Sequence, residues 1–139
     1  MVLDTSKYEE LLKNAGFTVH SGAIDFLKKY GGLRIHYPHA KVANMDDEMH
    51  FDPLIIVTHV RAVDVKAYGG VVGKELCPIG EAARGYLVLM MAEDGEGYAS
   101  YDNTFFRAGT SGSDAIEAFC SGREMESIPL EHGWENATD

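Results

Sequence analysis

Residues 76–92, LCPIGEAARGYLVLMMA, decide the fold of this 139-residue chain. Within them Tyr86–Met91 is a row of six apolar residues. A run so short and so apolar predicts a strand that is buried on both faces, since buried helices are usually longer. Pro78 and Gly80 predict a bend shortly before this strand. The rest of the chain is therefore expected to pack around a strand in the middle of a sheet.

A hairpin is predicted directly after this strand. Glu93–Gly97 (EDGEG) has the composition of a turn, because its two glycines give the backbone freedom and Asp94 can bond its own backbone. Polar and apolar side chains then alternate along Tyr98–Asp102. This alternation predicts the returning strand of the hairpin.

The residues before this hairpin predict three helices and two strands. The first helix is expected to start at a capping box, Ser6-x-x-Glu9, and to end at Gly16. The strands are expected from alternation or apolar character, and the segment between them is expected to be an exposed loop. The remaining predicted segments are helices over Ser21–Tyr30 and from Thr58 to Gly70 or Gly73, strands over Leu33–Tyr37 and Leu54–Val57, and a loop over Pro38–His50.

After the hairpin, Thr104–Arg107 predicts a short strand and Gly122 ends a last helix. The element order predicts an α+β fold with one mostly antiparallel sheet and the helices on one side. Residues 1–122 are expected to form a single domain. Residues 123–139 form an acidic C-terminal tail that is expected to pack partly on the domain through Trp134.

Length and composition indicate a globular protein. A chain of 139 residues, 45% of them hydrophobic, can bury a core without a metal or a disulfide. It has no apolar run of about 18 residues, which a membrane-spanning helix needs. Its first residues lack the basic-then-apolar order of a signal peptide. Cys77 and Cys120 are therefore expected to be reduced, buried thiols in a cytoplasmic protein.

The formal net charge is −10. This argues against direct binding to nucleic acid or to an anionic membrane, where phosphate groups require Lys and Arg. Two interpretations stay open on charge alone. The acidic surface keeps the protein soluble, or it complements a basic protein partner and speeds their encounter.

Six histidines raise the hypothesis of a small metal-dependent enzyme. His36 and His39 are the closest pair, and His50, Asp52 or His59 could add a third ligand. Three residues of spacing on a strand put two side chains on opposite faces, so scattered surface histidines are the simpler interpretation. Paired-cysteine and HExxH zinc patterns are absent from the sequence, so no cofactor is expected. A reactive thiol at Cys77 would need a nearby base to lower its pKa.

Several motifs together resemble the SUKH superfamily. Residues 24–33, IDFLKKYGGL, resemble its "FL..(F/Y)GGL" segment, and residues 76–89 resemble the "LxPIGEA…GYLxL" block of its third subgroup. Glu93–Gly95 before a returning strand and Gly109 before a helix complete the order. The resemblance covers about residues 16–122. It departs from the family at Gly97-Tyr98-Ala99, where Gly-Val-Tyr is common, and it leaves residues 38–52 and the tail unmatched.

The resemblance implies a bacterial immunity protein with a single sheet flanked by helices and no catalytic residues. Such proteins bind and neutralise a cognate polymorphic or contact-dependent toxin, often a nuclease or a deaminase. The expected partner is a toxin domain, with no nucleic acid, membrane or small-molecule substrate. Two alternatives stay open, a non-catalytic regulatory or scaffold module and the metal-dependent enzyme on His36, His39, Asp52 and His59.

Candidate partner contacts follow from composition and not from the family. They are acids of an expected loop, acids of the hairpin turn, and tyrosines that could anchor an interface. These residues are Asp46, Asp47, Glu48, Glu93, Asp94, Glu96, Tyr37, Tyr98 and Tyr101.

Overall fold

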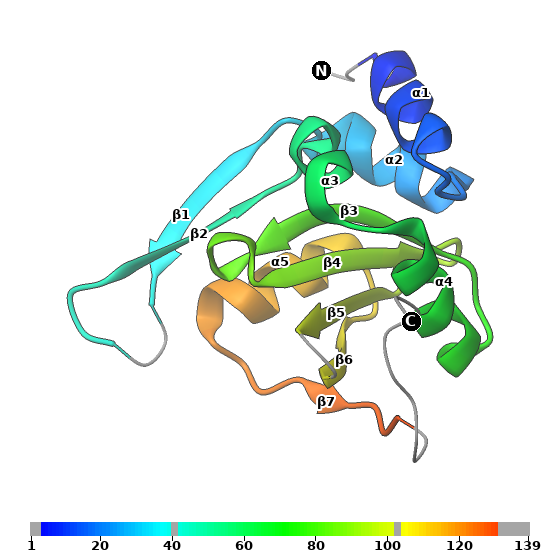
Figure 1. Cartoon of the computed structure of the whole chain (residues 1–139). Helices are drawn as coiled ribbons and strands as arrows, with labels where there is room; N and C mark the ends of the chain where they lie inside the picture. Colours follow the sequence, from blue (N-terminus) through cyan, green and yellow to red (C-terminus); the bar gives the residue numbers. More distant parts are fainter. Residues whose placement is uncertain (1–3, 40–41, 102–103, 131–139) are drawn as a thin grey trace.

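A computed structural model describes residues 4–39, 42–101 and 104–130 (Figure 1). These residues form one antiparallel sheet whose seven strands lie side by side in chain order, with helices around it. The α+β prediction is confirmed. The strands are β1 Arg34–Pro38, β2 Asp46–His50, β3 Leu76–Ala82, β4 Leu87–Ala92, β5 Gly97–Tyr101, β6 Thr104–Gly109 and β7 Glu126–Ser127. The helices are α1 Ser6–Asn14, α2 Ser21–Tyr30, α3 Pro53–His59, α4 Ala62–Val72 and α5 Gly112–Ser121, with a 3-10 turn η1 at Ala83–Gly85.

The predicted central hairpin is confirmed as β4 and β5, and β3 lies on the other side of β4. Pro78 and Gly80, where a bend was predicted, both belong to β3, in which all seven residues are buried. The register with β4 shifts between these two residues, and such a bulge bends a strand. A bulge suits a proline, because its nitrogen cannot donate to a neighbouring strand. Tyr86 lies just before β4, and its side chain is 69% exposed instead of buried.

Helices cover both faces of the sheet, not one face as the element order predicted. On one face Met91 lies beside Gly112 of α5 and Phe26 of α2. On the other face Tyr68 of α4 packs on the Phe105 ring, with 4.7 Å between ring centroids, and Tyr98 stacks on Phe105 at 5.5 Å. We refer to these as the α5 face and the α4 face of the sheet.

The segment around residues 51–72 differs from the prediction of a strand followed by one helix. Leu54–Val57 lies in helix α3, because Asp52 caps it by accepting a hydrogen bond from the Leu54 N–H at 3.0 Å. Pro53 occupies the first helical position, where its missing N–H costs nothing. The next helix, α4, begins at Ala62 and ends at Val72, so it does not start at Thr58.

The loop predicted over Pro38–His50 is also wrong in its second half. Residues 46–50 form β2, which pairs with all of β1 from Arg34↔His50 to Pro38↔Asp46. Only His50 of β2 pairs with β3, opposite Glu81. The β1–β2 hairpin therefore projects from the body of the protein as a two-stranded arm (Figure 1).

The helix caps are partly different from the sequence prediction. Ser6 is the first residue of α1, and its hydroxyl donates to Asp4, so Ser6 and Glu9 form no capping box. Thr5 makes the contact with Glu9 instead, at 2.8 Å. In the predicted tail, β7 pairs with β6, whereas Trp134 lies outside the described residues. None of the described helices is long and apolar enough to cross a membrane.

Candidate functional site

The structure separates the predicted acidic contacts into two groups at opposite ends of β4. Glu93, Asp94 and Glu96 follow the last residue of β4, whereas Asp46–Glu48 lie in the arm, which contacts η1 just before β4 begins. A six-residue strand spans about 20 Å. The two groups therefore cannot act as a single cluster.

The turn acids are engaged within the protein. Lys74 Nζ lies 2.8 Å from Asp94 Oδ2 and 2.9 Å from Glu96 Oε1. The hydrogen bond from Lys74 lowers the pKa of Asp94, and hydrogen bonds from the Tyr98 hydroxyl and from Lys74 lower the pKa of Glu96. Arg107 also lies within ion-pair distance of Glu96, at 3.4 Å. Lys74 and Arg107 therefore pair with Asp94 and Glu96 within the protein itself.

Two of the three candidate tyrosines are buried. Tyr98 is 1% exposed and Tyr37 is 8% exposed, so neither offers a side-chain surface to a partner. Tyr101, at the end of β5, is 44% exposed. Burial and the neighbouring Asp47 carboxylate raise the pKa of Tyr37 to about 12. Tyr37 pairs with Asp47 across the arm and lies close to the Ala83 backbone, so it lies between the arm and η1.

The acids of the arm differ in their surroundings. Glu48 lies 2.5 Å from Arg34 Nη1 and 3.6 Å from His36 Nε2. Asp46 is exposed, and Arg84 donates to its main-chain oxygen at 3.0 Å instead of to its carboxylate. Across the described ranges, no Lys, Arg or His side chain forms an ion pair with Asp46 or Asp47.

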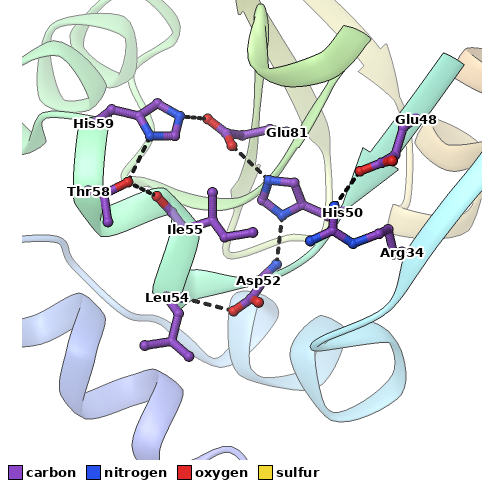
Figure 2. A network of polar contacts seen from close by, with 9 residues as sticks. All are labelled: Arg34, Glu48, His50, Asp52, Leu54, Ile55, Thr58, His59 and Glu81. Atoms are coloured by element: carbon purple, nitrogen blue, oxygen red, sulfur yellow. Dashed lines mark hydrogen bonds and ion pairs between the residues drawn. The ribbon is translucent and has the colours of Figure 1, made fainter.

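A buried polar network joins the arm, β3 and α3 on the α4 face of the sheet (Figure 2). The Glu81 side chain is 1% exposed and lies between two histidines. Its Oε1 is 2.7 Å from His50 Nε2, and its Oε2 contacts His59 Nε2. His50 Nδ1 accepts a hydrogen bond from the Asp52 N–H, so its Nε2 carries the proton that is donated to Glu81.

His59 also contacts the turn of α3 that precedes it. The Thr58 hydroxyl donates to the Ile55 carbonyl at 2.6 Å and lies 2.9 Å from His59 Nδ1. His59 therefore links Glu81 to the last turn of α3.

The residues of the metal hypothesis make separate contacts. His36 lies beside Glu48, His39 Nδ1 accepts from the Val42 N–H, Asp52 caps α3, and His59 belongs to the Glu81 network. Within the part of the chain that the structure describes, no three His, Cys, Asp or Glu side chains are placed to hold a metal ion. The structure therefore does not assemble the ligand set proposed from the sequence.

Glu81 was not predicted as a site residue from the sequence, where it was part of the "LxPIGEA" block. The available signal was an acidic residue inside an apolar strand, because a carboxyl group is rarely fully buried unless it is paired. The position of its partners could not be read from the sequence. His50 and His59 lie 31 and 22 residues away from it, on different elements.

The two cysteines are expected to differ in reactivity. Cys77 is fully buried, and burial raises the pKa of its thiol to about 12. Cys120, on α5, is half-buried. A thiol-specific disulfide reagent at mild alkaline pH should therefore modify Cys120 in the folded protein and Cys77 only after unfolding. A Cys120→Ser variant that still reacts while folded would contradict this expectation.

Comparison with known proteins identifies one family. The model of the family described as SUKH-3 immunity protein matches residues 2–122. Neither a curated protein nor a solved structure matches the chain. The matched region includes all the helices and six of the seven strands described above, and the family supports a role in toxin immunity. The chain belongs to the SUKH-3 immunity protein family.

Proposed function

We propose that this protein neutralises a cognate bacterial toxin by binding it directly, in the cytoplasm of the cell that it protects. Immunity proteins are generally not catalysts, and the proposal requires no reaction. The partner is a toxin domain, and the complex needs no nucleic acid, membrane or small-molecule substrate. Inhibition follows from occupying the surface that the toxin uses on its own target.

The observation that carries the proposal is the net charge of −10 in a member of an immunity family. A toxin that acts on nucleic acid, such as a nuclease or a deaminase, needs Lys and Arg to hold phosphate groups. An acidic protein is attracted to such a surface, and the attraction raises the association rate. Asp46 and Asp47, which lack ion-pair partners among the described residues, are available for this role.

Co-production with the toxin domain encoded immediately upstream tests the proposal. Cells that make the toxin domain alone should stop growing, and cells that also make this protein should grow. The purified proteins should elute as a 1:1 complex. Because charge steers the encounter, raising the salt concentration from about 0.05 to 0.5 M should lower the association rate constant about tenfold or more.

Two outcomes would contradict the proposal. One is growth arrest that is equally fast with and without this protein. The other is protection without a detectable complex, which would indicate an indirect role such as that of a regulatory module. An association rate that does not change with salt would reject the basic partner while leaving direct binding intact.

A further inference from the structure

An apolar groove lies on the α5 face of the sheet, where α5 has ended. It has a volume of about 390 Å³ and is lined by Ala83, Tyr86, Leu87, Tyr101, Phe106 and Met125. We call it the aromatic groove. Tyr86 is 69% exposed and Tyr101 is 44% exposed, and their rings meet edge to face with 6.1 Å between centroids. Exposed apolar side chains that gather in one patch often mark a site of protein–protein contact.

The turn that presents Tyr86 is held in an unfavourable conformation. Ala83, Arg84 and Gly85 have φ angles of +51°, +56° and +93° in succession. A left-handed conformation costs an L-residue about 1–2 kcal/mol, so two such residues in a row need compensating contacts. The arm supplies such contacts. Tyr37 lies close to the Ala83 backbone, and Arg84 donates to the Asp46 main-chain oxygen at 3.0 Å.

One acid of the arm lies near the rim of the aromatic groove. Asp47 pairs with Tyr37 across the arm, and Tyr37 lies close to the backbone of Ala83, which lines the groove. The side chain of Asp46 is on the other face of the arm, with Glu48 and His50, because neighbouring side chains of a strand alternate. An apolar centre with charged groups at its edge is the usual arrangement of a protein–protein interface.

We propose that the aromatic groove, with Asp47 near its rim, is the surface that holds the toxin. The occupant is a toxin segment that presents one large apolar side chain next to Lys or Arg. The proposal rests on the proposed function, because it names the contact surface of that complex. A second copy of this chain is a poor occupant, because two copies that each carry −10 repel one another.

The other acidic group is the natural comparison. Asp94, at the far end of β4, is exposed but already pairs with Lys74 at 2.8 Å. It can attract a basic protein from a distance, but it lies about 20 Å from the aromatic groove, by the length of β4. The substitutions Asp94→Asn and Asp47→Asn change the net charge equally, so only a difference between their effects on binding reports on the groove.

The test measures binding of the full-length protein to the toxin domain encoded immediately upstream. Tyr86→Ala and Tyr101→Ala should each raise the Kd about tenfold or more, mainly through faster dissociation. Leu54→Ala, which removes an apolar side chain that is 57% exposed on α3, should change the Kd less than about twofold. Asp47→Asn should weaken binding more than Asp94→Asn at about 0.1 M salt.

The outcomes separate this proposal from the proposed function. If the unaltered protein binds the toxin domain but the Tyr86→Ala, Tyr101→Ala double variant binds within twofold as tightly, the groove is rejected and the function stands. If the unaltered protein does not bind, both fail. If the protein forms a dimer that Tyr86→Ala dissociates, a second copy occupies the groove and the proposal is overturned. Tyr86→Phe should bind nearly normally, and equal urea midpoints would show that each variant folds.

Discussion

Glu81→Ala is expected to lower the free energy of unfolding by about 3–5 kcal/mol. Glu81 is 1% exposed, accepts a hydrogen bond from His50 of β2 and contacts His59 of α3. Alanine leaves both imidazoles without their partner and leaves a cavity, and each loss adds to the cost. It also removes the side-chain contact between His50 and Glu81, which are the register partners of β2 and β3. Urea unfolding should show a midpoint lower by roughly 2 M.

Two variants serve as controls for Glu81→Ala. In Glu81→Gln the amide oxygen can accept a hydrogen bond from His50, and the amide nitrogen can donate one to His59. The free energy of unfolding should therefore fall by only about 1 kcal/mol. Glu48→Ala removes the ion pair with Arg34, whose side chain is 52% exposed. This change should lower the free energy of unfolding by about 1 kcal/mol or less. If the Glu81→Ala variant unfolded at the same urea concentration as the unaltered protein, the network would contribute little to stability.

Gly80→Ala is expected to lower the free energy of unfolding about as much as Glu81→Ala, by about 3 kcal/mol or more. A Cβ atom at this position would lie 2.2 Å from the His50 carbonyl oxygen and 2.7 Å from the Phe51 ring. The carbonyl group belongs to the backbone of β2, so the strand itself would have to move. The change in unfolding free energy, measured by urea titration, checks this expectation.

Gly70→Ala is the matched control, because it makes the same chemical change where there is room. Nothing lies within 4 Å of a Cβ at Gly70, which is inside helix α4. Alanine favours helix over glycine by about 1 kcal/mol, so this variant should be slightly more stable than the unaltered protein. If Gly80→Ala and Gly70→Ala changed the free energy of unfolding equally, the close approach of β2 to Gly80 would be contradicted.

Local sequence patterns predicted the central hairpin, because burial and turn chemistry agree there. They failed where short-range and long-range effects compete. Leu54–Val57 is an apolar, β-branched run, yet Asp52 and Pro53 start a helix over it. Residues 46–50, DDEMH, have no strand-like composition and become β2 because β1 is available to pair with them. Such pairing depends on tertiary structure that a short window of sequence cannot contain.

The candidate site was predicted only in part, for the same reason. Charge identified Asp46 and Asp47 as acids without showing that they lie beside η1. Tyr86 was assigned to a buried strand from its apolar neighbours, although the left-handed turn before it places the side chain outside. Tyr98 was a candidate contact because it is aromatic and follows a turn, and burial beneath α4 removes it from the surface.

The order of the strands bears on how the protein reaches its native state. Each strand pairs with the strand next to it in the chain, from β1 through to β7. During synthesis every strand therefore emerges from the ribosome after the neighbour that it needs, and none has to wait for a distant segment. Topologies built from such near neighbours fold faster than those built from distant ones. A chain with this strand order is therefore expected to complete its sheet early during synthesis.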